Sequence, residues 1–507
     1  MMTKQEALDV VAQFPKFEPD AAYQAGLRLL KADYPEALLP IARKLAKRFV
    51  NDARMHQLLG LAARASGETV IALDAFKCAA QLAPSDALIA HSSARVTMEA
   101  GQPAVSLFER AASLAPQDGT VVQGLGAALY RDGRSSEAMA LLEQLTAANP
   151  LWLDGQRDLA HLRGQMGLPP LDCLAKRKNE LRQSRDLAHL HITLALEARQ
   201  LGLAASAAKD ATSNFGEESW VRVLSGHIQS ELGQYAEADA FFTGLNMTNS
   251  VGDASLYARH LIKAGRPREA AALLEPLVAN DLDHMLWPYL SLAWRLLNNE
   301  RWQWLEGDPR LIGTYNIAKK FGDMNGLAKR LRELHISKAE PLDQSVRGGT
   351  QTDGNLLLRS EPVFRRLRRA LMSAVDEHVQ QLPAFQADHP TLVKNREPRR
   401  ISGSWSVRLT QTGHHVDHVH SQGWLSSAFY VALPPKSTTA DQHDGWLSLG
   451  ECRELAPSLA PYKLVEPKVG QLVLFPSTMW HGTRPFPSGE RMSVAFDVAR
   501  PRQSKAG

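Results

Sequence analysis

The sequence predicts a multidomain protein in which an all-α solenoid precedes a mainly β domain of the jelly-roll kind with flanking helices. Three observations support this fold class. Glycines recur at nearly constant spacing through the first 300 residues. Short runs rich in β-branched and aromatic residues replace the helical periodicity after residue 400. Six of the 17 histidines lie between residues 411 and 481, so we expect the functional site in the β region.

The composition is that of an ordinary globular protein, with 44% hydrophobic and 22% charged residues over 507 positions. A net charge of +4 is too small to argue for a nucleic-acid partner. Cys78, Cys173 and Cys452 form neither a CxxC pair nor a disulfide framework. No signal peptide and no membrane-spanning stretch is visible. We therefore expect a cytoplasmic protein that binds neither nucleic acid nor membrane.

Seven glycines mark the repeat. They are Gly67, Gly101, Gly133, Gly167, Gly202, Gly233 and Gly265. The successive gaps are 34, 32, 34, 35, 31 and 32 residues. We expect each glycine to end the first helix of a helical hairpin, in a conformation that is costly for other residues. One hairpin cannot bury its own apolar face, so consecutive hairpins should stack into a solenoid.

Two segments, LLGLAARASGETVIALDAFKCAAQLAP and GLGAALYRDGRSSEAMALLEQLTAANP, resemble tetratricopeptide repeats. The resemblance covers roughly residues 20–300, and we assign residues 1–300 to a tetratricopeptide-like solenoid. It implies a concave surface that binds a protein or peptide, or that mediates self-association. The sequence does not select between these partners.

The region between the repeats and the strands is expected to be helical. We assign residues 301–340 to a helical connector and read the polar, glycine-containing segment 341–355 as a loop. Arg347 and the two glycines after it are candidates for a flap over the mouth of a site. The next segment, SEPVFRRLRRALMSAVDEHVQQLP, has apolar residues every three or four positions. This spacing predicts an amphipathic helix with Ser360 as its N-cap.

Five short runs with β character follow. They are ISGSWSVRLTQ, WLSSAFYVALP, DGWLSLGE, GQLVLFPS and RMSVAFDVAR. Turn residues separate them and few helical segments intervene. Such a pattern is typical of an antiparallel sandwich or barrel.

The stretch HHVDHVH, which precedes the second of these runs, offers two competing pairs of metal ligands. Residues i and i+2 of a strand project to the same side. Either His418 with His420, or His415 with Asp417, could therefore hold one ion. Neutral imidazole suits Fe(II), Zn(II) and Cu(II) alike. A third ligand must come from a distant strand, and His481 in FPSTMWHGTRPF is the natural candidate.

The last run, RMSVAFDV, should have two different faces. Arg491, Ser493, Ala495 and Asp497 share one face, and four apolar residues share the other. An arginine on an inward face is costly without an anionic partner. Because a guanidinium matches a carboxylate in a bidentate fork, Arg491 indicates a cosubstrate that carries a carboxylate.

The paired ligands, the distal histidine and an R-x-S ten residues later resemble the 2-oxoglutarate- and Fe(II)-dependent oxygenases. HVHSQGWLSSAFYV, VGQLVLFPSTMWHGTRPF and GERMSVAFDV are similar in particular to a bacterial branch of these oxygenases that is fused to tetratricopeptide repeats. The resemblance implies a double-stranded β-helix domain over residues 341–507. It also implies Fe(II), 2-oxoglutarate and O2 as cofactor and cosubstrates.

In that branch the ligand pair before the strand is H-x-H, which selects His418, His420 and His481 as the metal ligands. The set of His415, Asp417 and His481 remains the alternative.

The resemblance also implies which residues bind 2-oxoglutarate. Arg491 and Ser493 form the R-x-S motif. Tyr430 stands where related enzymes often place a tyrosine that bonds to the cosubstrate.

The implied reaction oxidises 2-oxoglutarate to succinate and CO2 and hydroxylates a protein or peptide that the repeats recruit. One alternative is a non-catalytic interaction protein in which the β domain is a degenerate metal-binding module. Another is a cupin-like metalloenzyme that does not use 2-oxoglutarate.

Overall fold

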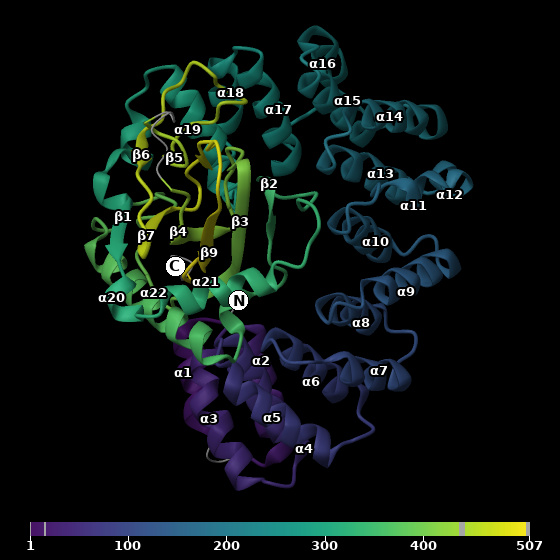
Figure 1. Cartoon of the computed structure of the whole chain (residues 1–507), viewed down its shortest axis with the longest axis vertical. Helices are drawn as coiled ribbons and strands as arrows, with labels where there is room; N and C mark the ends of the chain where they lie inside the picture. Colours follow the sequence, from purple (N-terminus) through teal and green to yellow (C-terminus); the bar gives the residue numbers. More distant parts are fainter. Residues whose placement is uncertain (1, 15–16, 436–441, 503–507) are drawn as a thin grey trace.

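The computed structural model describes residues 2–14, 17–435 and 442–502. The first part of the chain is a series of helices. They are α1 (Lys4–Gln13), α2 (Pro19–Lys31), α3 (Pro35–Arg48), α4 (Ala53–Ala65), α5 (Thr69–Leu82), α6 (Ala87–Glu99), α7 (Val105–Leu114), α8 (Gly119–Arg131), α9 (Ser135–Ala148), α10 (Leu153–Gln165), α11 (Asp172–Ala175), α12 (Lys178–Gln183), α13 (Arg185–Glu197), α14 (Leu201–Phe215), α15 (Ser219–Glu231), α16 (Tyr235–Phe242), α17 (Val251–Lys263), α18 (Pro267–Leu274) and α19 (Trp287–Leu296). They stack into an arc that curves along one side of the β domain (Figure 1).

The repeat glycines end helices as predicted, with one exception. Six of the seven have φ between 71° and 78°, in the left-handed region. Gly202 instead lies inside α14, and Arg199 takes the left-handed turn with φ of 58°. Arg199 follows Gly167 by 32 residues and precedes Gly233 by 34, so it keeps the phase of the repeat better than Gly202 does. The packing of the helices therefore sets the position of this turn, although the backbone of a non-glycine residue is strained in the left-handed region.

The second part of the chain contains all the strands among the described residues. Its elements are β1 (Gly313–Asn316), α20 (Ala318–Phe321), α21 (Met324–Leu334), β2 (Val346–Gln351), α22 (Pro362–Gln381), β3 (Ile401–His415), β4 (Gly423–Ala432), β5 (Leu447–Leu449), β6 (Lys463–Val465), β7 (Gln471–Pro476), β8 (His481–Thr483) and β9 (Arg491–Ala499). One sheet has the order β1-β7-β4-β9-β3-β2 and the other β6-β5-β8, with antiparallel pairing throughout. Two such sheets make the jelly-roll form of the double-stranded β-helix that the sequence predicts.

Different residues bury the two faces of the larger sheet. The stripe of α22 packs with Phe429 and Val494 in a core on the outer face. Each fully buried side chain of this size stabilises the fold by about 1.5–3 kcal/mol. Tyr430 and Phe475 point the other way, toward Leu449 of the smaller sheet. The alternation predicted for β9 is confirmed, because its four apolar residues all join the outer core.

Sequence patterns missed the two edge strands of this sheet. The connector 301–340 contains β1, which pairs with β7, and the expected loop 341–355 contains β2, which pairs with β3. Both strands are short and lack a clear alternation of apolar and polar residues, so only the sheet edge beside them explains their conformation.

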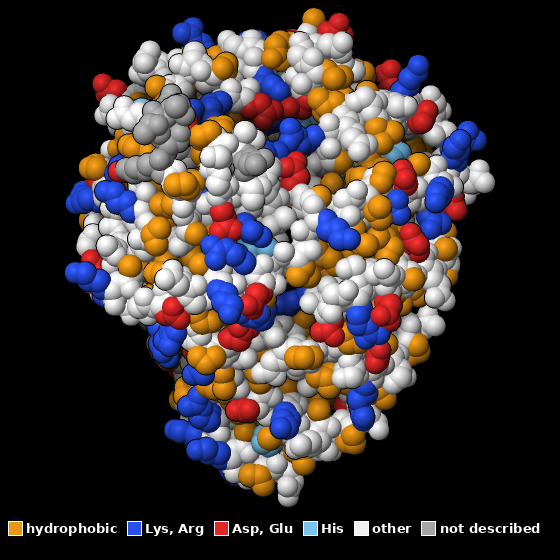
Figure 2. Space-filling model, in the orientation of Figure 1, with side chains coloured by type: hydrophobic (Ala, Val, Ile, Leu, Met, Phe, Trp, Pro, Cys, Tyr) orange, Lys and Arg blue, Asp and Glu red, His pale blue; other side chains and the backbone are white. Residues whose placement is uncertain are grey.

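Both ends of the arc are attached to the β domain. At the first end, Arg400 forms ion pairs with Asp33 and Glu36. At the far end, Arg259 of α17 lies 2.6 Å from Glu454, and the Trp480 indole donates to a backbone carbonyl of α19 at 2.9 Å. In the space-filling view, acidic and basic side chains alternate where the arc and the β domain meet (Figure 2). The arc therefore lies alongside the β domain rather than end to end with it.

Two repeat glycines leave room for arginine side chains of the second part of the chain. A Cβ added to Gly101 would lie 2.5 Å from the Arg359 guanidinium, and one added to Gly67 would lie 2.5 Å from that of Arg368. Ser360, predicted as the N-cap of α22, instead bonds to the backbone of α6: its amide donates to the Ala100 carbonyl at 2.9 Å. The cap position belongs to Glu361.

Replacing Gly101 by alanine should destabilise the chain more than replacing Gly133. Both glycines have φ near 77°, so both variants should lose about 1–2 kcal/mol from backbone strain. Nothing lies within 4 Å of a Cβ at position 133, whereas at position 101 the buried Arg359 must also shift. We expect a further loss of about 1 kcal/mol, measured by urea denaturation. Equal losses would show that this contact does not stabilise the attachment.

Within the described ranges, none of the helices combines the length and the apolar character that a membrane span requires.

Candidate metal centre

The predicted ligands meet between the two sheets, beside β8. His418 and His481 exchange backbone hydrogen bonds of 2.9 Å in each direction, so the segment after β3 extends the smaller sheet by one bridge. The His420 amide donates to the Ser477 carbonyl at 3.0 Å. Between the two histidines, Val419 packs into the core at the far end of the arc. The H-x-H spacing thus puts both imidazoles on one side and the valine on the other.

One ring nitrogen from each of His418, His420 and His481 lies within 4.8 Å of those of the other two. The protein binds the Nδ1 atom of all three rings. His418 Nδ1 donates to the Val416 carbonyl at 2.8 Å, and His481 Nδ1 donates to the Met479 carbonyl at 2.9 Å. These bonds leave the Nε2 lone pairs on the side of a shared ion, where the Ser345 hydroxyl also lies 3.2 Å from the His418 Nε2.

His420 has a different partner. Its Nδ1 donates to the Asp497 carboxylate at 2.8 Å. The Ser426 hydroxyl donates to the same carboxylate at 2.7 Å. A carboxylate behind a metal-bound histidine orients the ring and raises its basicity. Sequence analysis placed Asp497 on the same face of β9 as Arg491 but assigned it no role.

Electrostatics keep two of these rings neutral. Burial, and next the neighbouring His420, lower the pKa of His418 to about 3. Burial, and next the neighbouring His418, hold the pKa of His481 well below its usual value. Two rings are therefore deprotonated at neutral pH, which is the state that binds a metal ion.

The alternative ligands are not brought together. Asp417 accepts three hydrogen bonds from Arg453, from the backbone amide at 2.8 Å and from the guanidinium at 2.7 and 2.6 Å. Both its oxygens are therefore occupied. His415 lies closer to the site: its ring stacks on that of His418 at 5.7 Å, and its Nδ1 lies 2.9 Å from the Ser345 hydroxyl. The strand ends at His415, and this change of direction separates the two candidate pairs.

Arg491, Ser493 and the three histidines line one cavity. Arg491 is only 2% exposed, and its guanidinium carbon lies 5.1 Å from the centre of the Tyr430 ring. Among the described residues, neither the Arg491 Nε nor the Tyr430 hydroxyl has a hydrogen-bond partner. A buried cation with an unsatisfied donor is unfavourable. A carboxylate that entered the cavity would meet Arg491, whose guanidinium lies beside the Tyr430 ring, so this arginine fits a 2-oxoglutarate carboxylate.

Other residues that line this cavity were not predicted from the sequence. Trp405 lies against the His420 ring at 5.3 Å. Gln344, Ser345 and Gln351 come from β2 and the segment before it. The predicted flap, Arg347 with Gly348 and Gly349, is instead part of the edge strand β2, and these three residues do not line the cavity.

Replacing Asp497 with asparagine should weaken metal binding by about 10- to 100-fold, because the His420 ring would lose its anionic partner. Titration calorimetry with Ni(II) measures this effect. Asp376→Asn is the matched control, since Asp376 is a surface carboxylate on α22 that pairs with Arg399. An affinity of Asp497→Asn that equals this control would contradict the assigned role.

Two families match parts of this chain. Residues 403–497 match the family described as "Putative 2OG-Fe(II) oxygenase", and residues 101–159 match the tetratricopeptide repeat. No curated protein matches the chain.

Among solved structures, HygX from Streptomyces hygroscopicus with nickel and 2-oxoglutarate bound is 13% identical, covers 38% of this chain and 83% of its own, and has a TM-score of 0.28. A prolyl-4-hydroxylase from Pseudomonas putida is 15% identical, with coverages of 38% and 94% and a TM-score of 0.26. A tetratricopeptide repeat protein from Parabacteroides merdae is 14% identical, with coverages of 50% and 98% and a TM-score of 0.29. The chain thus joins tetratricopeptide repeats to a C-terminal domain that matches the 2OG-Fe(II) oxygenase family.

Proposed function

We propose that this protein is an Fe(II)- and 2-oxoglutarate-dependent oxygenase in which His418, His420 and His481 hold the metal. One observation carries the proposal: each ring has its Nδ1 bound by the protein, so the Nε2 atoms are left for one ion. Three ligands on one side of an iron ion leave positions for 2-oxoglutarate and O2. When bound, the iron supplies the redox chemistry that the side chains lack.

In this proposal Arg491 binds the carboxylate of 2-oxoglutarate that is remote from the metal. The Arg491 Nε, which has no hydrogen-bond partner among the described residues, and the Tyr430 ring beside the guanidinium support this role. Ser493 lines the same cavity and adds a third donor. The chain's own residues thus orient the cosubstrate and exclude water from it.

The substrate that we propose is a protein or peptide. The arc of residues 1–300 would recruit it to the domain of residues 341–507, since tetratricopeptide repeats present extended surfaces for such partners.

Succinate formation tests the proposal. The metal-free chain would be given Fe(II) and 2-oxoglutarate in air, with and without ascorbate, and succinate would be measured. We expect slow turnover even without the prime substrate, and none with Zn(II) in place of iron. A chain that binds iron but makes no succinate under any of these conditions would contradict the proposal.

A second candidate is a non-catalytic module that binds zinc. It is favoured by the lack of a carboxylate among the three converging ligands, because Asp417 is engaged by Arg453. Three neutral imidazoles leave the full charge on the ion, whereas many iron oxygenases have one anionic protein ligand. Tight zinc binding without any succinate formation would support this candidate.

A further inference from the structure

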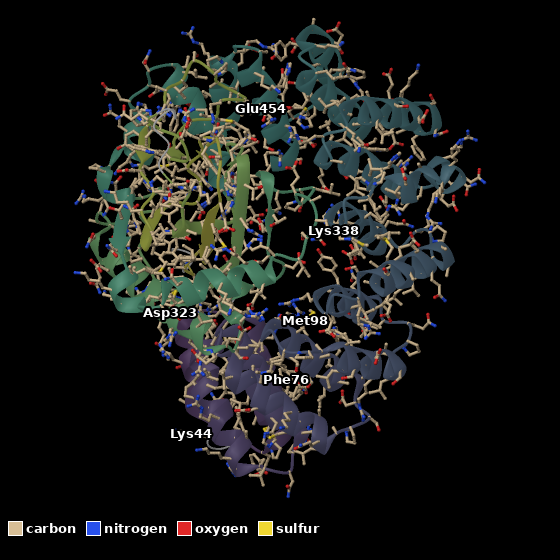
Figure 3. All side chains as sticks on the ribbon, in the orientation of Figure 1. Lys44, Phe76, Met98, Asp323, Lys338 and Glu454 are labelled. Atoms are coloured by element: carbon tan, nitrogen blue, oxygen red, sulfur yellow. The ribbon has the colours of Figure 1, made fainter. Side chains whose placement is uncertain are left out.

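One segment of the chain contacts both the repeats and the metal centre. Residues 336–345, which we call the strap, follow α21 and lead into β2. Figure 3 shows Lys338 of the strap between the helical arc and the β domain. The strap therefore lies on the inner side of the arc.

The strap is attached to the inner side of α8 and α10. A hydrogen bond of 2.9 Å joins the hydroxyls of Ser337 and Tyr130. The Lys338 amide donates to the Gln165 carbonyl at 2.8 Å. A Cβ added to Gly164 would lie 2.9 Å from the Leu342 side chain, so the leucine packs directly on the backbone of α10.

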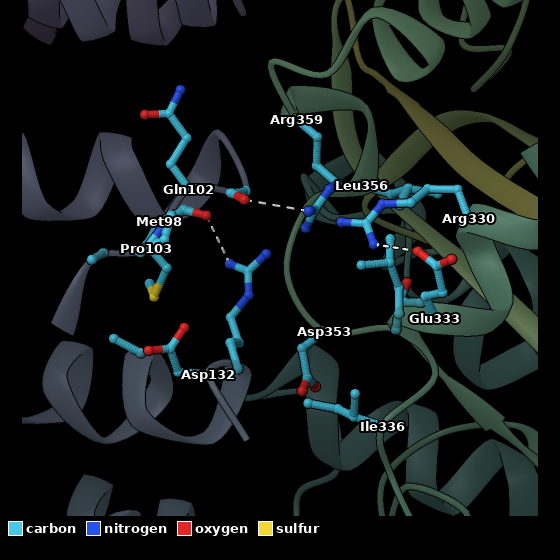
Figure 4. Close-up of a pocket in the computed structure, with 16 residues that line it drawn as sticks. Met98, Gln102, Pro103, Asp132, Arg330, Glu333, Ile336, Asp353, Leu356 and Arg359 are labelled. Atoms are coloured by element: carbon cyan, nitrogen blue, oxygen red, sulfur yellow. Dashed lines mark hydrogen bonds and ion pairs between the residues drawn. The ribbon is translucent and has the colours of Figure 1, made fainter. Parts of the chain in front are cut away.

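There is space beside the first residues of the strap. Ile336 lines a cavity of about 250 Å³ that also touches Met98 and Arg131 of the repeats. Asp353, just after β2, lines it from the β domain (Figure 4). The Gln165 amide donates to Asp353 at 3.0 Å. The first residue of the strap therefore has unfilled space beside it, between the arc and the β domain.

The other end of the strap reaches the proposed ligands. The Ser345 hydroxyl oxygen lies 2.9 Å from His415 Nδ1 and 3.2 Å from His418 Nε2. The Val416 amide donates to the Ser345 carbonyl at 2.9 Å, which fixes the backbone there. Because His418 donates through Nδ1, its Nε2 carries the lone pair. The serine therefore donates to His418 and accepts from His415.

We propose that Ser345 is a positioning residue of the metal centre and that the strap holds it there from the inner face of α8 and α10. A lone pair on His418 cannot serve both a hydroxyl proton and a metal ion. Metal entry therefore requires the Ser345 hydroxyl to turn away, and the contacts of the strap on the repeats set how easily it does so. Coupling of this kind is reciprocal, so metal binding also loosens the strap. The inference rests on the metal site of the proposed function.

Nickel binding to the full chain, measured by titration calorimetry, tests the role of Ser345. Removing a hydrogen bond that competes with the metal should tighten binding in Ser345→Ala by about two- to tenfold. Ser345→Thr keeps the hydroxyl and should bind nickel as the natural chain does. An unchanged or weaker affinity of Ser345→Ala, or a Ser345→Thr variant that matches it, would overturn the role.

Variants at the far end of the strap test the coupling. Tyr130→Phe and Leu342→Ala should each tighten nickel binding, although neither residue lines the metal cavity. Tyr23→Phe is the matched control, because Tyr23 donates to Gln57 at 2.7 Å in the first repeats, away from the strap. In the Ser345→Ala background, Leu342→Ala should have little further effect. Additive effects, or a Tyr130→Phe affinity equal to that of the control, would refute the coupling.

Hydrogen exchange gives a second readout. Nickel should speed exchange at residues 336–343 in the natural chain but not in His481→Ala. If the natural chain bound no nickel, or if His481→Ala bound it equally well, the proposed metal site itself would be wrong. If nickel bound as proposed but Ser345 and Leu342 variants behaved like the natural chain, only the role of the strap would be wrong.

Discussion

Replacing His481 with alanine is expected to weaken metal binding by more than about 100-fold and to abolish succinate formation. Loss of a hydrogen-bond partner behind a metal ligand already costs about 10- to 100-fold, and loss of one of three ligands must cost more. Bound iron per chain and nickel affinity measure the first effect. Circular dichroism and urea denaturation should show that the fold persists, because β8 is held by backbone bonds rather than by this ring.

Asp417→Asn is the informative comparison for this variant. Arg453 occupies both oxygens of Asp417, so iron content should be retained. The fold should lose stability instead, since a charged hydrogen bond contributes about 1.5–3 kcal/mol. Loss of iron in Asp417→Asn with retention in His420→Ala would favour the alternative set of ligands and reject the one proposed.

Replacing Arg491 with alanine is expected to raise the 2-oxoglutarate concentration for half-maximal succinate formation by about 100-fold or more. Truncating one partner of a buried charge pair typically costs about 2–5 kcal/mol, and 1.4 kcal/mol corresponds to tenfold. Iron content should not change, because Arg491 is not among the converging ligands. In the free protein the buried Arg491 Nε has no hydrogen-bond partner among the described residues, so the free energy of unfolding should stay equal or rise.

Arg408→Ala is the matched control for Arg491. Arg408 lies on the neighbouring strand, where it faces Met492 in register, but its side chain forms an ion pair with Glu490 at 2.6 Å. Its loss should leave the 2-oxoglutarate requirement unchanged. Indifference to Arg491→Ala as well would point to a metalloenzyme that does not use 2-oxoglutarate.

Local periodicity was enough to predict much of the fold. The period-2 pattern of RMSVAFDV placed Arg491 and Asp497 on the inner face, because burial of Val494 and its neighbours leaves only one register. The spacing of the glycines placed most of the hairpin turns. The H-x-H spacing brought two rings to one side, and the structure brings them together with His481.

What escaped prediction depends on partners distant in sequence. Ser360 has the chemistry of a helix cap, yet it bonds to the backbone of Ala100, 260 residues earlier. Arg199 takes a turn that glycine would favour, because the stacking of whole hairpins decides where the helix ends. Ser345 stands in a polar segment with no periodicity, and it lies beside a histidine because β2 pairs with β3 and the Val416 amide donates to its carbonyl. No local pattern encodes such long-range contacts.

The attachment of the arc at both ends changes how the repeats should unfold. A free stack of hairpins frays from its terminal units, which have a neighbour on only one side. Here Arg400 and Arg259 tie those units to the β domain. The weakest place therefore moves inward, toward the short helices α11 and α12. Because α8 and α10 are attached as well, the rest of the arc should unfold together with the sheets that hold it.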